Sequence, residues 1–427
     1  MHSKTAGDSV RPGCFCLIFT RLFSKIENTR RLLQPVDVLK AKARDCMNSK
    51  EVGELRRRLA PDKNAITHIY GCFVNGSGEI VADIQESMGT ITQQDAEEYL
   101  GLLKKTLSGS LGRNLIDIVF STEQVMDSEE HRLLSALRGS ALRDAEARTA
   151  FYQKIIGNVD MDGANYLILL AHDTYDVPRR GGDGETQADA SDEVFSYILC
   201  CVCPVRDGKQ GLGYFSQENE FHSYLSSQTV APPELGFLFP AFDDRTANIY
   251  NALFYTRRPD NLHSGFIDAV FHTEPPLSAT EQREGFETAL ADALEDACSA
   301  DVVQAVHEQL CTRIQLHKES RDPEPLTVTA GEVGQVLADC GVEEPRVQAF
   351  CEKCDEQFGQ GAALSPENLI DSKHFQLKTG DAVINVSPES SYLVQTRVID
   401  GRKYILIPAD EGVEINGLAV GITMPQP

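Results

Sequence analysis

The residues with the clearest chemical potential are a histidine and two aspartates that follow an apolar segment. His172, Asp173 and Asp176 come directly after residues 166–171, whose apolar character predicts a buried strand. Loops at strand ends commonly position reactive groups, and a histidine beside two carboxylates could bind a divalent cation or move protons. A structural role is equally open to His172, which could satisfy a backbone partner at the margin of a sheet.

A second polar group follows another apolar segment. Asp243, Asp244 and Arg245 come after residues 235–242, so the two polar groups could converge at one face of an N-terminal sheet. That arrangement would support a metal-dependent hydrolase with a His/Asp cluster. The alternative is that Asp243 or Asp244 caps a helix beginning near Thr246. Structural roles are favoured for both groups.

A Cys-x-x-Cys pair makes zinc a further alternative. Cys351 and Cys354 have Cys340 upstream, and His317 and His374 could complete a ligand set. However, the two cysteines share one helical stripe with apolar residues: Val347, Phe350, Cys351, Cys354 and Phe358. Such a stripe is typical of a core-facing surface on which cysteine acts as a small hydrophobe. We therefore expect core cysteines and no metal, also for three cysteines of an apolar segment: Cys200, Cys201 and Cys203.

Several recognisable reaction signatures are missing from the sequence. It contains no phosphate-binding loop, and the glycines at 208, 211 and 213 do not fit a dinucleotide fingerprint. Neither a Gly-x-Ser-x-Gly elbow nor a His-Glu-x-x-His pair occurs. Asp160, Asp162 and Gly163 lack the remaining positions of a calcium-binding loop and predict a turn. Other kinds of catalysis are left open by these absences.

Length and composition indicate an ordinary globular protein. The chain has 427 residues, which suggests two or three domains, and its 41% hydrophobic and 24% charged residues are close to globular averages. The longest apolar stretches fall well short of the 18 or so residues that a membrane span needs. We therefore expect a soluble protein.

Net charge and cysteine distribution narrow the partners and the compartment. A formal net charge of −24 opposes binding to nucleic acid and to anionic membranes. The twelve cysteines are scattered and do not form the dense framework of a small secreted domain, which favours a reducing, cytoplasmic location. A protein or a small molecule remains as the partner.

Residues 1–46 differ in charge from the rest of the chain. They hold nine Lys or Arg and four Asp or Glu, a net charge of +5, so the remainder carries −24 − 5 = −29. A basic amphipathic membrane anchor is conceivable, because Leu22, Phe23 and Ile26 share a possible helical face. The favoured interpretation is a misplaced start, with translation beginning at Met47.

Residues 47–275 predict a mixed sheet with flanking helices. A helix capped by Ser49 ends before Pro61, and residues 66–74 and 79–84 predict a hairpin. Further helices are predicted at 92–109, 128–137, 141–156, 246–255 and 262–271, and further strands at 115–120, 166–171 and 194–205. A flexible polar loop at 181–191 and a hairpin at 214–224 complete this part.

After Pro275-Pro276 the pattern changes to consecutive helices, which makes residues 276–427 a second domain. Ser278 with Glu281 and Thr329 with Glu332 form capping-box patterns. Small strands are predicted at 382–386, 392–399 and 403–407, the last two joined by a turn at Asp400-Gly401. The expected fold class is α+β.

Several stretches together resemble one bacterial family. They are Ile69-Tyr70-Gly71-Cys72, Lys105-Thr106-Leu107-Ser108-Gly109, Asp189-Ala190-Ser191-Asp192-Glu193-Val194, Tyr197-Ile198-Leu199-Cys200, Cys203-Pro204-Val205, and residues 235–245, 399–404 and 409–413. From about Met47 to Gly417 the chain is similar to domain-of-unknown-function family 4317. The resemblance implies a bacterial cytoplasmic protein and supplies neither a cofactor nor catalytic residues.

Two functional hypotheses follow. The first is a non-catalytic cytoplasmic binding or regulatory protein, because the acidic chain carries no recognised reaction signature. The second is a metal-dependent hydrolase that uses four residues: His172, Asp173, Asp176 and Asp243. A deep pocket joining these side chains would favour the hydrolase, and their separation in space would favour the binding protein.

Overall fold

The computed structural model describes residues 47–421, apart from 181–185, 209, 216, 218–219, 226–227 and 411. The predictions for residues 1–46, and part of the predicted polar loop, lie outside the described residues. In the part that is described, no helix combines the length and the apolar character that crossing a membrane requires.

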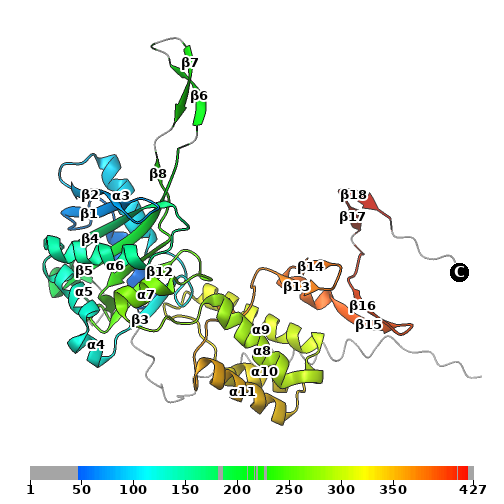
Figure 1. Cartoon of the computed structure of the whole chain (residues 1–427). Helices are drawn as coiled ribbons and strands as arrows, with labels where there is room; N and C mark the ends of the chain where they lie inside the picture. The colour runs from blue at the N-terminus through cyan, green and yellow to red at the C-terminus, as the bar shows by residue number, and fades with distance from the viewer. Residues whose placement is uncertain are drawn as a thin grey trace, which may run out of the picture. The chain divides into compact units, whose positions relative to one another are not determined.

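An eight-stranded sheet forms the centre of the N-terminal part (Figure 1). Its strands are β1 (His68–Val74), β2 (Ile80–Ser87), β3 (Leu115–Val119), β4 (Asn165–Arg180), β5 (Thr186–Arg206), β8 (Thr229–Val230), β9 (Leu235–Phe239) and β12 (Asn251–Thr256). The order is β2-β1-β4-β5-β9-β12-β3, and β8 pairs with β5. Every pairing between these strands is antiparallel, whereas a mixed sheet was expected. Short connections such as β1 to β2 can join only antiparallel neighbours.

Helices cover both faces of this sheet. One face packs against α2 (Ser49–Arg58) and α3 (Gln93–Lys105). The other packs against α5 (Glu129–Gly139), α6 (Ala145–Asn158) and α7 (Ser264–Phe271), which Figure 1 shows across the near side. The short α4 (Thr122–Asp127) precedes α5. Burial on both faces explains why β4 and β5 contain continuous apolar runs rather than an alternating pattern.

Several local predictions in this part are wrong. Residues 186–191 of the predicted polar loop belong to β5. The helix expected at 246–255 is instead β11 (Thr246–Asn248), a turn and β12. All six residues of β12 are buried, and an apolar segment with no polar face has no periodicity that separates strand from helix. The cap of α2 is Asn48 rather than Ser49, because the Asn48 side chain accepts hydrogen bonds from the amides of Lys50 and Glu51.

Two further hairpins accompany the sheet. β10 (Ala241–Asp243) pairs with β11, so no helix begins at Asp243 or Asp244. β6 (Gln210–Phe215) pairs with β7 (Glu220–Leu225), which agrees with the hairpin predicted near residues 214–224.

The C-terminal part consists of helices followed by small antiparallel sheets, so the α+β class is confirmed. The helices are α8 (Ala279–Leu294), a 3-10 turn (Glu295–Ala297), α9 (Ala300–Ser320), α10 (Ala330–Asp339), α11 (Glu344–Phe358) and α12 (Pro366–Leu369). Both predicted capping boxes are present, at Ser278 with Glu281 and at Thr329 with Glu332. The small sheets pair β13 (Phe375–Lys378) with β14 (Val383–Val386), β15 (Gln395–Ile399) with β16 (Arg402–Leu406), and β17 (Val413–Ile415) with β18 (Leu418–Val420). A 3-10 segment (Pro388–Leu393) precedes β15.

Candidate functional site

Asp173 is a structural anchor inside β4, because the strand continues past the predicted loop to Arg180. Its side chain is only 1% exposed and forms an ion pair of 3.1 Å with Arg58 at the end of α2. The Tyr197 hydroxyl donates a hydrogen bond of 2.7 Å to Oδ2, and the Ala65 amide donates one of 2.7 Å to Oδ1. A buried carboxylate with both oxygens occupied in this way is fully compensated. These contacts assign Asp173 a structural role.

A second ion pair fastens the middle of α2 to the sheet. Glu54 accepts hydrogen bonds from the Tyr175 hydroxyl at 2.6 Å and from Arg245 Nη1 at 2.6 and 2.8 Å. Arg245 Nη2 also donates to the Pro178 carbonyl at 2.8 Å. Burial, reinforced by the hydrogen bond to Glu54, raises the pKa of Tyr175 to about 12. Arg58 lies 4.2 Å from the centre of the Tyr175 ring, so a cation–π contact joins the two ion pairs.

The second predicted group, residues 243–245, forms the tip of the β10–β11 hairpin near the start of α2. Asp244 and Arg245 both have positive φ, at 46° and 61°, which matches the two central positions of a tight hairpin turn. Asp243 accepts a hydrogen bond from the Asn248 side chain at 3.1 Å, and Asp244 is exposed. The Arg245 amide donates to the Glu51 carboxylate at 3.3 Å. Burial is the main cause that raises the pKa of Glu51, and the nearby Asp243 and Asp244 add to the effect.

His172 and Asp176 point to the opposite face from Asp173. Residues alternate across a strand, and His172 Nε2 lies 2.9 Å from Ser196 Oγ in the neighbouring strand. Burial lowers the pKa of His172, and Arg138 and Arg143 lower it further. Asp176 is exposed. The sheet therefore separates His172 from Asp173, and the expected gathering of the four residues on one face is wrong.

The described residues contain no group of three or more His, Cys, Asp and Glu side chains that could hold a metal ion. Cys354 is buried in the helical core, and the Cys351 thiol lies 3.7 Å from the Ala330 carbonyl. His317 Nε2 lies 2.8 Å from the Glu324 carbonyl, and His374 Nδ1 lies 3.2 Å from its neighbour Asp371. Cys340 is exposed. These side chains belong to different local environments, and the core interpretation of Cys354 fits its burial.

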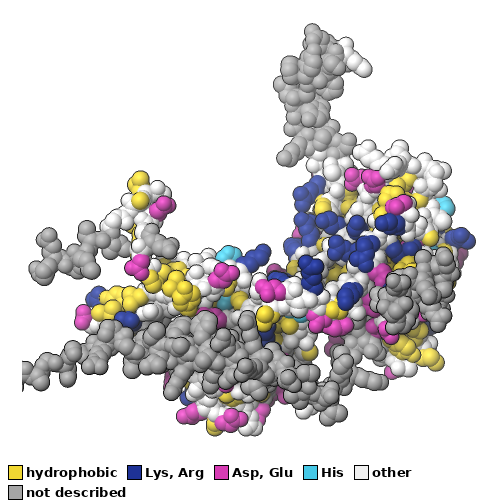
Figure 2. Space-filling model, turned by 180° about the vertical axis from the view of Figure 1, so that it is seen from behind, with side chains coloured by type: hydrophobic (Ala, Val, Ile, Leu, Met, Phe, Trp, Pro, Cys, Tyr) yellow, Lys and Arg dark blue, Asp and Glu magenta, His cyan; other side chains and the backbone are white. Residues whose placement is uncertain are grey.

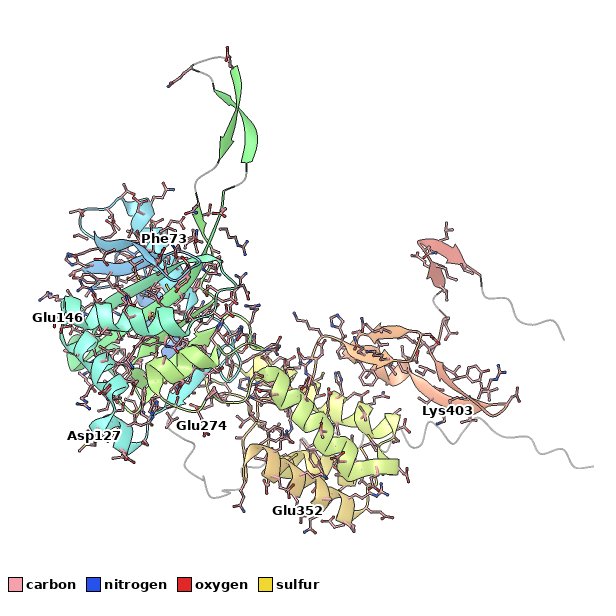
Figure 3. The ribbon with its side chains drawn as sticks, viewed as in Figure 1. Phe73, Asp127, Glu146, Glu274, Glu352 and Lys403 are labelled. Carbon is pink, nitrogen blue, oxygen red and sulfur yellow. The ribbon has the colours of Figure 1, made fainter. Side chains whose placement is uncertain are left out.

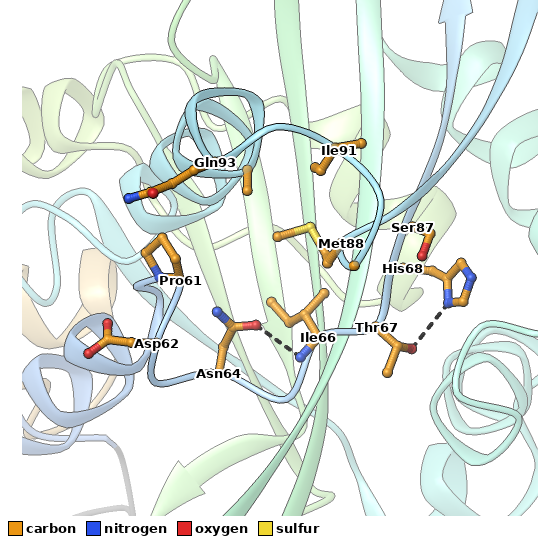
Figure 4. Close-up of a pocket in the computed structure, with 12 residues that line it drawn as sticks. Pro61, Asp62, Asn64, Ile66, Thr67, His68, Ser87, Met88, Ile91 and Gln93 are labelled. Atoms are coloured by element: carbon orange, nitrogen blue, oxygen red, sulfur yellow. Dashed lines mark hydrogen bonds between the residues drawn. The ribbon is translucent and has the colours of Figure 1, made fainter.

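An open hollow of about 750 Å³ lies where α2 leads into β1 and β2 leads into α3 (Figure 4). It is lined by Pro61, Asp62, Asn64, Ile66, Thr67, His68, Ser87, Met88, Gly89, Ile91, Gln93 and Ala96. The register of the hairpin brings its walls together, because His68 pairs directly with Ser87. Internal hydrogen bonds shape one wall: Asn64 accepts from the Ile66 amide at 3.0 Å, and His68 Nδ1 lies 3.2 Å from Thr67 Oγ1.

The lining of the hollow contains few ionisable side chains. Its ionisable side chains are Asp62 and His68, and the remainder of the lining is apolar or neutral. A nucleophile needs a base within hydrogen-bonding reach. Within the described part of the chain, the hydrogen bonds of His68 involve Thr67 and do not extend to Ser87.

The sequence analysis did not identify the residues that attach α2 to the sheet or those that line the hollow. Glu54 and Arg58 are four positions apart on α2, a spacing that predicts a pair on the helix surface, whereas each reaches a partner on the sheet side. The alternation of His172, Thr174 and Asp176 with buried Asp173, Tyr175 and Val177 was the available signal that the strand continues. For the hollow, the predicted hairpin was the available signal, because pairing of its two strands brings residues 61–68 and 87–96 side by side.

Comparison with known proteins agrees with the resemblance seen in the sequence. No curated protein matched the chain. The family model described as a domain of unknown function (DUF4317) matches residues 47–418, which is most of the chain. The chain belongs to this DUF4317 family.

Proposed function

We propose that this protein is a non-catalytic binding or regulatory protein and that its ligand or partner occupies the hollow beside β1 and β2. The observation that carries the proposal is the hollow itself, which is open, mainly apolar and provided with a few polar groups. This composition is typical of binding sites. The carboxylates considered for catalysis support the same conclusion, because Asp173 is already paired with Arg58.

The proposal can be tested by introducing a large side chain into the hollow, with a matched control substitution on the same helix, α3. Gln93 lines the hollow (Figure 4), and its side chain donates a hydrogen bond of 2.8 Å to Glu97. The variants Gln93→Trp and Glu97→Trp therefore lose the same exposed hydrogen bond, but only Gln93→Trp places an indole in the hollow. Saturation-transfer NMR with a small-fragment library should detect fragments that bind the wild-type chain and Glu97→Trp but not Gln93→Trp. Equal fragment binding by all three proteins would overturn the proposal.

A cytoplasmic, bacterial setting and a domain boundary near residue 276 complete the proposal. The described cysteines are free, and burial raises the pKa of the Cys72 thiol to about 12. Thiols of this kind are unreactive and suit a reducing compartment. The proposal excludes nucleic acid and anionic membranes as partners, because the net charge of −24 opposes both.

A further inference from the structure

Beside the hollow lies a sheet edge with which no other strand of the described residues pairs. β2 is the end strand of the eight-stranded sheet, and β1 is the strand paired with it. Ile80 is 40% exposed and Val81 is 59% exposed, and most of the strand is exposed as well. An end strand of eight residues offers a row of outward-facing backbone N–H and C=O groups to which another strand can pair. The opposite end strand, β3, has only five residues.

The second observation is the charge of this edge. From residue 64 to residue 103 the chain contains no Lys or Arg and six acidic residues: Glu79, Asp83, Glu86, Asp95, Glu97 and Glu98. Figure 2 shows many basic side chains of the N-terminal part together on the side seen from behind. Arg148 lies nearer to the hairpin, 4.2 Å from the centre of the Tyr70 ring, but it is buried and donates a hydrogen bond to the Leu142 carbonyl. Burial raises the pKa of Tyr99 on α3, and the nearby carboxylates of Glu86 and Asp95 raise it further. The charge around β2 is therefore a local excess of carboxylates.

The third observation is how these carboxylates are distributed over β2. Asp83 pairs with Cys72, whose side chain belongs to the core on the α6 side of the sheet. Glu86 lies three residues further on and interacts with Tyr99 on the α3 side. The two carboxylates therefore face opposite sides of the sheet. The end of β2 then leads into the hollow, which Ser87 and Met88 line.

We propose that β2 accepts an extended, basic peptide segment of a partner protein as an additional strand, which runs along the sheet edge to the hollow. Backbone hydrogen bonds to β2 provide the affinity, and side chains provide the selectivity. Basic residues three positions apart fall on opposite faces of the added strand, where each meets one carboxylate as a cross-strand pair. The inference rests on the proposed binding role and specifies its partner.

The alternative is that the acidic edge only prevents unwanted pairing, since charged side chains on end strands commonly have this effect. A labelled peptide with the sequence Val-Lys-Val-Thr-Lys-Val-Thr distinguishes the two, because fluorescence anisotropy of the full-length chain measures its binding directly. Strand addition predicts binding that is at least tenfold weaker when both lysines are replaced by glutamate. In an added strand, alternate peptide amides face β2. N-methylation of these amides should abolish binding, whereas N-methylation of the amides between them should leave binding nearly unchanged.

Variants of the protein complete the test. Asp83→Lys should weaken peptide binding at least tenfold, whereas Glu352→Lys on helix α11 (Figure 3) makes the same charge change and should not. Both residues are exposed, so thermal melts should show that both variants are folded. Equal effects of the two N-methylated registers, or an unchanged affinity with Asp83→Lys, would overturn strand addition. If fragments in that case still bind Glu97→Trp but not Gln93→Trp, the proposed binding role of the hollow is retained and only the proposed peptide partner is rejected.

Discussion

Arg58 and Asp173 are 115 residues apart in the sequence, yet three hydrogen bonds of 3.1 to 3.3 Å join their side chains. Asp173 is buried and Arg58 is 17% exposed, so this pair is shielded from water far more than a surface ion pair. Removing one partner of a buried pair leaves an uncompensated charge and costs about 3 to 5 kcal/mol. We therefore expect Asp173→Ala and Arg58→Ala each to lower the free energy of unfolding by an amount in this range.

Urea unfolding of both single variants and the double variant measures this coupling. The double variant should lose much less than the sum of the two single losses, because the second replacement removes the charge that the first left unpaired. Asp176→Ala is the matched control, since Asp176 is exposed on the same strand and should change stability by less than about 0.5 kcal/mol. Additive losses would show that the two side chains do not stabilise the fold as a pair.

The raised pKa of Glu51 predicts that the protein becomes less stable as pH rises. Burial raises its pKa in the folded chain above the value of 4.5 that it has when unperturbed. Between the two values the folded state holds a proton that the unfolded state releases, so stability falls as pH rises through this window. The stability of Glu51→Gln relative to wild type should therefore increase from pH 4 to pH 7 in urea titrations. A difference that is constant over this range would contradict the assignment.

The lowered pKa of His172 predicts the opposite: the protein becomes less stable as pH falls. Burial lowers its pKa in the folded chain below 6.5, so the unfolded chain takes up the proton first as the solution becomes more acidic. Stability is present above pH 6.5 and is lost as pH falls through the window between the two pKa values. His172→Gln, which can still form a hydrogen bond to Ser196, should have a flatter stability profile from pH 7 to pH 5. A profile parallel to that of the wild type would show that His172 does not titrate differently on folding.

The fold could be predicted where local patterns decide it. The helix at the start of the described chain follows from Val52, Leu55 and Leu59 at helical spacing, and all three are buried. β12 could not be predicted as a strand, because an apolar segment buried on both faces has no alternating pattern. Its place between β9 and β3 is a property of the sheet and not of its own six residues.

The candidate site was only partly readable for a similar reason. Polar residues after an apolar segment suggested a loop at His172 and Asp173, whereas the strand tolerates a buried Asp173 because Arg58 neutralises it. Arg58 belongs to a helix that is far from Asp173 in the sequence, so no local pattern around Asp173 predicts the ion pair. The hollow, in contrast, follows from the predicted hairpin, in which the pairing of His68 with Ser87 brings the two connecting segments together.

Cys354 should act as a core residue without zinc. It is buried in the helical core, and burial raises the pKa of its thiol to about 12, which opposes the thiolate that zinc binds. Elemental analysis of the purified protein should find less than one zinc per chain. Cys354→Ser should lower the free energy of unfolding by about 1 to 3 kcal/mol, because it buries a hydroxyl in an apolar setting. The exposed Cys340→Ser should be neutral, and one zinc per chain that disappears with Cys354→Ser would refute the core role.

Glycine substitutions at Asp244 and Arg245 distinguish the effect of backbone strain on stability from the effect of side-chain contacts. Both residues have positive φ, a conformation that costs a side-chain-bearing residue about 1 kcal/mol and that glycine adopts freely. Asp244 is exposed, so Asp244→Gly should raise the free energy of unfolding by about 0.5 to 1 kcal/mol. Arg245→Gly relieves the same strain but removes the ion pair with Glu54 and the hydrogen bond to Pro178, so it should destabilise the protein. Urea unfolding of the two variants should therefore give changes of opposite sign. Stabilisation by both replacements would mean that Arg245 does not anchor the hairpin to α2, and the attachment of that helix would then depend on Arg58 and Asp173.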